Sequence, residues 1–172
     1  MIDLTRYIRD VPDFPKPGIV FKDITPLLAD HQALRETIAR LVDPFRHKGV
    51  EVVAAVESRG FIFGALAAGE LQAALVPIRK PGKLPYRTVS QSYELEYGTD
   101  TIEVHEDAVR RGQRVLMVDD VLATGGTMAA ACRLVRRLGG DILAAAFVIE
   151  LAFLSGRERI GDCTVHSLIQ VK

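Results

Sequence analysis

Two adjacent carboxylates followed by a loop of small residues form the stretch with the clearest chemistry. Asp119 and Asp120 end an apolar run that begins at Val115, and Ala-Thr-Gly-Gly-Thr follows at 123–127. This loop opens a helix, where unpaired N–H groups and the positive end of the helix dipole favour an anion such as phosphate. The carboxylates would repel phosphate oxygens, but as hydrogen-bond acceptors they suit the paired hydroxyls of a ribose. The stretch therefore predicts a site for a ribose 5-phosphate group.

The same loop lacks the lysine of a nucleotide-triphosphate site. A P-loop carries Lys followed by Ser or Thr after its last glycine, so that a cation reaches the outer phosphates. Residues 123–127 contain no lysine. An ordinary strand, turn and helix with a solvated acidic end is the alternative interpretation.

A second polar loop, Glu-Ser-Arg-Gly at 57–60, follows an apolar run at 52–56 and opens the next helix. Ser58 and Gly60 offer hydrogen-bond donors to an anion, and Arg59 offers a fork of charged donors. The alternative is a helix cap with a solvated arginine. Two anion loops at one sheet edge favour a ligand with phosphate groups at both ends.

A basic loop follows the next apolar run. Arg79, Lys80 and Lys83 lie around Pro81-Gly82, which forces a turn and lets the three cations converge. Cations stabilise the charge that gathers on a phosphate leaving group. Short basic runs are also common as solvated segments. The loop is interpreted as part of a binding site only because an acidic site for the sugar accompanies it.

Residues 13–26 contain three prolines and a glycine, and we expect no regular structure there. The apolar side chains between Phe14 and Phe21 are too numerous for a solvated tail. We expect a fixed cap of about residues 1–28 over the active site, with a flat aromatic ligand as its target. Phe21 would stack on the ring while the backbone of Val20 and Lys22 pairs with its polar edge. A flap packed on the core is the alternative.

Strand-like runs alternate with helical patterns along most of the chain, which predicts an α/β fold: a central, mostly parallel sheet flanked by helices. One helix is expected near 31–47, after Asp30 as N-cap and with a kink at Pro44. Another is expected near 126–138, ended by Gly139-Gly140. Ligands of such sheets bind beyond the carboxyl ends of the strands. The expected strands are 50–56, 74–79, 114–119, 142–151 and 164–170.

Residues 80–106 interrupt this alternation. A loop rich in proline and lysine leads into alternating segments on either side of Gly98. This pattern predicts a flexible loop and a hairpin that stands off the main sheet. A long excursion of this kind is usually a lid or a binding loop, although it can also be a surface hairpin without function.

Composition narrows the class of protein. The chain has 172 residues, 48% of them hydrophobic, and 22 basic residues balance 22 acidic ones. We expect one domain, no membrane span, no secretory signal and no nucleic-acid partner. Cys132 and Cys163 have no metal-ligand spacing, and we interpret them as reduced packing residues of a cytoplasmic protein.

Five motifs, in order along the chain, resemble the type I phosphoribosyltransferases and, within them, the adenine-specific branch. They are Asp-Phe-Pro-x-Pro-Gly-Ile-Val-Phe-Lys-Asp-Ile-Thr-Pro, Glu-Ser-Arg-Gly-Phe-Ile-Phe-Gly, Arg-Lys-Pro-Gly-Lys-Leu-Pro, Tyr-Glu-Leu-Glu-Tyr-Gly and Asp-Asp-Val-Leu-Ala-Thr-Gly-Gly-Thr. The resemblance implies a type I phosphoribosyltransferase fold. It also implies that adenine and phosphoribosyl pyrophosphate become AMP and pyrophosphate in purine salvage. Mg²⁺ bound to phosphoribosyl pyrophosphate, without a direct protein ligand, and a homodimer are implied as well.

The resemblance assigns the site residues by role. Transfer would pass through an oxocarbenium-like state, so the protein would act by positioning and charge stabilisation. Glu96 would share the adenine N7 proton, and Glu96 with Tyr97 would belong to the lid. The catalytic set is Glu96, Asp119, Asp120 and Arg59; the 5-phosphate and ribose set is Asp119, Asp120, Ala123, Thr124, Gly125, Gly126 and Thr127; the pyrophosphate set is Ser58, Arg59, Arg79, Lys80 and Lys83; and the adenine set is Val20, Phe21, Lys22, Val121 and Leu122.

Two alternatives stay open at this point. The chain could be a phosphoribosyltransferase for another base, such as xanthine or orotate, or a non-catalytic regulator that senses phosphoribosyl pyrophosphate. Two residues also depart from the family pattern. Lys22 stands where many relatives have arginine, and Tyr86 follows Leu-Pro where another residue is more usual.

Overall fold

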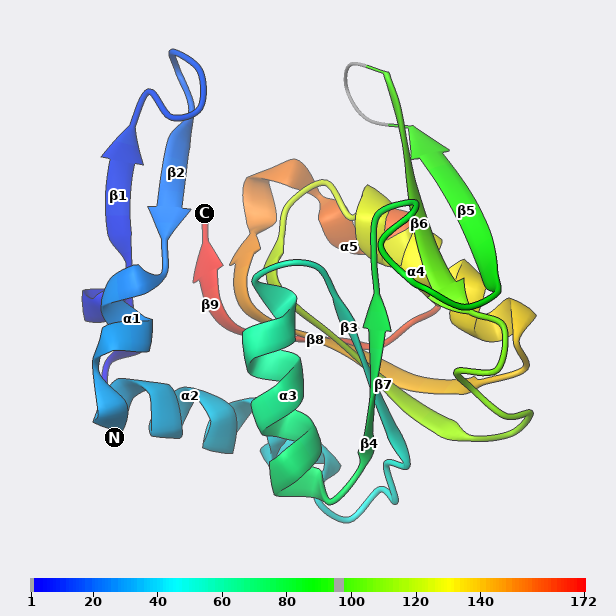
Figure 1. Ribbon diagram of the computed structural model, residues 1–172. Coiled ribbons are helices and arrows are strands. Elements are labelled where there is room, and N and C mark those ends of the chain that lie inside the picture. Colours follow the sequence, from blue (N-terminus) through cyan, green and yellow to red (C-terminus); the bar gives the residue numbers. More distant parts are fainter. Residues whose placement is uncertain (1, 95–97) are drawn as a thin grey trace. The chain divides into compact units, whose positions relative to one another are not determined.

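The computed structural model describes residues 2–94 and 98–172 (Figure 1). The chain divides into two compact units, one ending at Arg40 and the other running from Leu41 to Lys172. The predicted Glu96 and Tyr97 lie outside the described residues. The expectation of a single domain stays a prediction.

The N-terminal unit is built on a short hairpin. A 3-10 turn, η1 (Leu4–Tyr7), precedes strands β1 (Arg9–Pro12) and β2 (Val20–Asp23), which pair antiparallel as a two-stranded sheet. Helix α1 (Thr25–Ala29) follows. The expectation that 13–26 has no regular structure is therefore wrong from residue 20 onward. Pro15 and Pro17 lie in the turn before β2, and Pro26 lies in the first turn of α1, where its missing N–H costs nothing.

The next helix begins where its sequence predicts but ends at Val42, earlier than the expected residue 47. Helix α2 (His31–Val42) follows Asp30, whose Oδ1 accepts a hydrogen bond from the Ala33 N–H at 2.8 Å. This is the N-cap contact expected of aspartate. The regular helix stops before Pro44, and the chain continues as the 3-10 turn η2 (Asp43–Phe45). Where the sequence predicts a kink at Pro44, the structure instead changes from α-helical to 3-10 geometry, because proline has no N–H to continue the helix.

A five-stranded, fully parallel sheet forms the centre of the second unit, with the order β4-β3-β7-β8-β9. All five predicted strands are present, as β3 (Val52–Val56), β4 (Ala74–Ile78), β7 (Arg114–Leu122), β8 (Asp141–Leu151) and β9 (Val165–Val171). Strand β7 runs to Leu122 instead of ending at Asp119. The aspartates therefore lie within the last residues of β7, where Asp119 is paired with Phe147 of β8.

Helices cover the two faces of this sheet. Helix α3 (Gly60–Leu71) packs so closely on β3 that a Cβ atom on Gly64 would overlap the side chain of Ala55. Val52, Ala54 and Val56 alternate with Ala55 and join the buried cluster that contains Met128 of α4 (Gly126–Arg137). Since neighbouring strand residues point to opposite faces, α3 and α4 lie on opposite sides of the sheet.

The predicted hairpin forms a sheet of its own. Strands β5 (Thr88–Glu94) and β6 (Thr99–His105) pair antiparallel, and Figure 1 shows them beside α4. Tyr93, Ile102 and Val104 are buried in the cluster that contains α4. The base of the hairpin is thus part of the core, although its strands are not part of the main sheet.

The chain ends with the 3-10 turn η3 (Ala152–Leu154), the short helix α5 (Gly156–Ile160) and β9. Cys132 and Cys163 are buried, free thiols, as the packing interpretation predicts. Among the described residues, no helix combines the length and apolar character needed to cross a membrane.

Candidate active site

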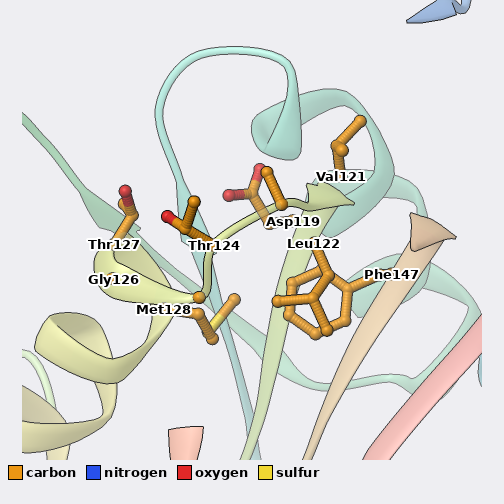
Figure 2. A pocket seen from close by; sticks show the side chains of 10 residues that line it. Asp119, Val121, Leu122, Thr124, Gly126, Thr127, Met128 and Phe147 are labelled. Carbon is orange, nitrogen blue, oxygen red and sulfur yellow. The ribbon is translucent and has the colours of Figure 1, made fainter. Parts of the chain in front are cut away.

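A pocket lies where β7 ends and α4 begins (Figure 2). Its cavity volume is about 80 Å³. Figure 2 shows the oxygen atoms of Asp119, Thr124 and Thr127 along the loop, with the side chains of Leu122 and Phe147 beneath it. The lining residues are Asp119, Val121, Leu122, Ala123, Thr124, Gly125, Gly126, Thr127, Met128 and Phe147.

The start of α4 provides the features of this pocket that favour an anion. Gly125 is the N-cap residue, with φ at 79°, and no side chain caps the first turn of the helix within the described part of the chain. The first turn also lacks an acidic residue. Its N–H groups are therefore unsatisfied by the helix and carry the positive end of the dipole of a 12-residue helix. A phosphate group at this position would accept hydrogen bonds from these N–H groups and interact favourably with the helix dipole.

The two aspartates differ in their surroundings. Asp119 is half-buried, lines the pocket, and accepts a hydrogen bond from the Asp120 N–H at 2.8 Å. Burial raises the pKa of Asp119 well above its usual range, and the charge of Asp120 raises it further. Asp120 is only 5% exposed and does not line the pocket. The structure thus brings Asp119 to the loop Ala123–Thr127, called the phosphate loop below, and places Asp120 outside the pocket.

Asp120 forms an ion pair with the second predicted loop. Its Oδ2 lies 2.7 Å from Arg59 Nε, although this oxygen accepts no hydrogen bond of good geometry from the described residues. Gly60, the first residue of α3, packs against Asp119, because a Cβ atom there would lie 2.7 Å from Asp119 Oδ1. Both carboxylates therefore face the N-terminal end of α3, whose dipole favours negative charge.

Glu57 organises the basic loop, a role that the sequence did not reveal. Its Oε2 accepts hydrogen bonds from Arg79 Nε at 3.1 Å and from the Lys80 N–H at 2.7 Å. Arg79 also donates to the Lys83 carbonyl at 3.2 Å and pairs through its backbone with Glu103 of β6. The turn is therefore held from both sides, while Ser58 and Lys83 remain exposed.

A chain of polar contacts links the basic loop to the phosphate loop through the hairpin. Thr127 Oγ1 donates to Tyr93 Oη at 3.2 Å, and Tyr93 Oη donates to Asp100 Oδ2 at 3.2 Å. Lys80 Nζ pairs with the same Asp100 oxygen. Burial acts against both charges and is the largest single influence, but the Lys80–Asp100 hydrogen bond and charge attraction, with the contacts of Tyr93 and the Thr101 N–H, together outweigh it. The pKa of Lys80 is therefore raised and the pKa of Asp100 is lowered.

Tyr93 and Asp100 were not predicted as site residues. The available signal is their position, because they face each other across the two strands of the hairpin. An aromatic hydroxyl opposite a carboxylate on a half-buried hairpin requires polar partners.

The predicted adenine residues divide between the two units. Val121 and Leu122 line the pocket, whereas Val20, Phe21 and Lys22 belong to β2 of the N-terminal unit. Phe21 packs edge-on against Phe14, with ring centroids 5.2 Å apart. Phe14 and Val20 keep 52% and 47% of their surface exposed. The segment therefore presents an apolar face that a flat ring could cover.

Comparison with known proteins assigns the family. A model of the phosphoribosyl transferase domain matches residues 22–169. The chain belongs to the phosphoribosyltransferase family. A relative from Methylococcus capsulatus, called adenine phosphoribosyltransferase, is 59% identical over 98% of this chain and 99% of its own length. The fold class expected from the sequence, a type I phosphoribosyltransferase fold, is confirmed.

Solved structures of family members agree with this assignment. The crystal structure of adenine phosphoribosyltransferase from Rhodothermus marinus has a TM-score of 0.94 and 53% identity, and the match covers 98% of this chain and 96% of that chain. The Saccharomyces cerevisiae adenine phosphoribosyltransferase, complexed with an imino-altritol bisphosphate and adenine, has a TM-score of 0.91 and 37% identity over 96% of each chain.

Proposed function

We propose that this protein transfers the 5-phosphoribosyl group of phosphoribosyl pyrophosphate to adenine, giving AMP and pyrophosphate. The pocket from Asp119 to Thr127 carries the proposal, because it combines an uncapped helix N-terminus with a carboxylate that lines the same cavity. Relatives called adenine phosphoribosyltransferase, 52–59% identical over nearly the whole chain, support adenine as the base.

The phosphate loop would hold the 5-phosphate, with the first N–H groups of α4 and the hydroxyls of Thr124 and Thr127 as donors. Asp119 would accept from the ribose hydroxyls. Asp120 would join it once the pyrophosphate end of the substrate competes for Arg59, its present ion-pair partner. This exchange would couple binding at the two ends of the substrate.

Catalysis would consist of positioning and charge stabilisation. The anomeric bond weakens before adenine bonds fully, and negative charge grows on the departing pyrophosphate. Arg79, Lys80 and Lys83 would stabilise that charge, with Glu57 holding the loop in shape. Glu96 would share the adenine N7 proton and, with Tyr97, would close the site.

Mg²⁺ would arrive with phosphoribosyl pyrophosphate. Within the described residues, no group of three or more His, Cys, Asp or Glu side chains could hold a metal. Mg²⁺ takes most of its ligands from water and substrate phosphates, so a metal carried by phosphoribosyl pyrophosphate would need no direct protein ligand in this site. When bound, Mg²⁺ neutralises charge on the pyrophosphate.

A homodimer in the cytoplasm completes the proposal. Helix α3 is apolar except for Glu70, and a helix this apolar is normally buried on most of its surface. Ile62 and Leu66 are nevertheless 39% and 42% exposed, next to Leu75 at 43%. These three side chains offer a surface for a second copy. The two free thiols, Cys132 and Cys163, fit a reducing compartment.

A base panel tests the activity. Purified protein, phosphoribosyl pyrophosphate and Mg²⁺ are mixed separately with adenine, guanine, hypoxanthine, xanthine and orotate, and pyrophosphate release is followed together with the nucleotide formed. We expect AMP with adenine and discrimination of about 10⁴-fold against the other bases, the scale of sites built on polar pairing. Comparable turnover of another base would refute the adenine assignment, and absence of pyrophosphate release with every base would refute the enzyme.

A further inference from the structure

The phosphate loop rests directly on another stretch of backbone. Gly125 has φ at 79°, and a Cβ atom on it would overlap the carbonyl oxygen of Gly156. Conversely, a Cβ atom on Gly156 would overlap the Ala123 carbonyl oxygen and lie 3.1 Å from the Gly125 nitrogen. Two glycines thus allow two backbones to touch. Because proteins are close-packed, the position of Gly156 determines the shape of the loop above it.

Gly156 begins helix α5, which has only five residues. A helix this short has little stability of its own, so its position depends on contacts to the rest of the unit. Its last residue, Ile160, is buried in the hydrophobic cluster, and its second residue, Arg157, supplies the polar contacts. Arg157 Nε and Nη2 donate to the two carboxylate oxygens of Glu150 at 2.5 and 2.6 Å. A bidentate pair of this kind fixes orientation as well as distance.

The Glu150 carboxylate is itself firmly held. It is 4% exposed at the end of β8, and Gln170 Nε2 donates to it at 3.2 Å. The hydrogen bond from Arg157 outweighs the opposing effect of burial and lowers the pKa of Glu150. Arg157 also donates to Ser167 Oγ at 3.1 Å and to the Val165 carbonyl at 3.3 Å, both on β9. The network therefore ties α5 to the last two strands of the sheet.

We propose that Glu150 and Arg157 are positioning residues for the 5-phosphate, acting through Gly156 as the support beneath the Ala123–Thr127 loop. This inference rests on the proposed function and names the residues that keep its phosphate site in shape. The pair touches no substrate. It holds α5 so that the first N–H groups of α4 converge on one point.

The direct test is Gly156→Ala, with Gly69→Ala as its control. Gly156 does not require positive φ, so the added methyl group acts by contact with the loop. Gly69 lies in α3 with nothing within 4 Å of a Cβ atom. Because a misplacement of about 1 Å can cost up to about 100-fold, we expect Gly156→Ala to raise the Kd of AMP and the KM of phosphoribosyl pyrophosphate at least about tenfold. The KM of adenine should change less than about threefold, and Gly69→Ala should leave all three constants unchanged.

A second pair of variants covers the case in which Gly156→Ala does not fold. Arg157→Lys keeps the charge but loses the bidentate fork, and Glu70→Gln breaks the exposed Arg46–Glu70 ion pair as its control. We expect Arg157→Lys to raise the Kd of AMP about three- to tenfold, again without a matching change for adenine. Equal changes in the constants for AMP and for adenine, or no change for AMP in a folded variant, would overturn the inference. The parent protein separates the two hypotheses, because failure of the parent to form AMP would refute the proposed function instead.

Discussion

Adjacent acids on one strand acquire different environments because their side chains alternate between its faces. Asp119 lines the pocket, whereas Asp120 lies behind it in an ion pair with Arg59. Two carboxylates this close repel each other, and burial removes the water that would screen them. Their repulsion therefore destabilises the folded protein even before any substrate binds.

Asp119→Asn should therefore stabilise the folded protein while lowering its turnover. The pKa of Asp119 is raised on folding, so ionisation opposes folding, and the penalty is absent below the unfolded pKa and grows as pH rises above it. We expect the variant to gain on the order of 1 kcal/mol at pH 7.5, about 2–4 °C in Tm, and nothing at pH 3. Thermal melts at both pH values measure this. A loss of stability at pH 7.5 would contradict the proposed repulsion, and unchanged turnover would remove Asp119 from the site.

Lys22 tests whether a side chain or the backbone recognises the base. Its Nζ pairs with Asp10 Oδ1 at 2.7 Å across the β1–β2 hairpin. We expect Lys22→Ala to keep the preference for adenine over guanine within about threefold, because backbone groups of β2 would do the recognition. Pro17→Gly combined with Phe21→Ala, which loosens the turn and removes the ring contact with Phe14, should abolish it. Loss of discrimination in Lys22→Ala alone would show that the side chain reads the base.

The residues of the phosphate loop could be predicted from the sequence because they are consecutive, and one stretch carries the strand, the loop and the helix start. The ion pair between Arg59 and Asp120 could not, since it depends on β3 and β7 being neighbours in the sheet. Gly156 could not be predicted either, since its contact with Gly125 depends on how α5 packs beneath the loop. The signal for Glu150 was a single charge at the end of an apolar strand, which indicates a buried partner without naming it.

Between elements, we expect the join of β7 and α4 to control phosphate binding. Gly125 and Gly126 are neighbours with different constraints. Gly125 combines φ at 79° with the contact to Gly156, whereas a Cβ atom on Gly126 would meet its nearest neighbours at an ordinary 3.5 Å. The pair therefore forms a matched comparison within one loop.

Gly125→Ala should weaken AMP binding much more than Gly126→Ala. The first variant adds strain of about 1 kcal/mol or more from positive φ, together with an overlap that displaces the loop. The second adds a methyl group where there is space. Calorimetry should give a Kd for AMP raised at least about tenfold in Gly125→Ala and less than about threefold in Gly126→Ala. The reverse order would mean that the loop is not shaped by its contact with Gly156.

Elements with a strong period were predictable, and short elements among prolines were not. The parallel strands read as apolar runs, and the hairpin alternates on either side of Gly98, so both follow from pattern. Strand β2 and helix α1 were missed because proline usually excludes regular structure, and the sequence alone does not show that Pro15, Pro17 and Pro26 occupy positions that tolerate it. In the fold, two of them lie in a turn and the third lies at a helix start.

For the whole molecule, the exposed apolar face of α3 predicts self-association. Ile62 and Leu66 are four residues apart on one side of the helix, and Leu75 of β4 lies beside Gly64. We expect sedimentation to show a dimer for the parent and a monomer for Ile62→Glu combined with Leu66→Glu. Exposed Tyr86 provides a control, since Tyr86→Glu should leave the dimer intact. A monomeric parent would contradict the proposed homodimer.

A crystal structure of the protein with AMP and pyrophosphate bound together would test the proposed substrate site as a whole. We predict that the phosphate accepts hydrogen bonds from the first N–H groups of α4, between Gly125 and Thr127. The ribose hydroxyls should lie about 2.6–3.2 Å from carboxylate oxygens of Asp119 and Asp120. Arg59 should have moved away from Asp120. A phosphate bound elsewhere, with Asp119 contacting the ribose neither directly nor through a water molecule, would contradict the proposed site.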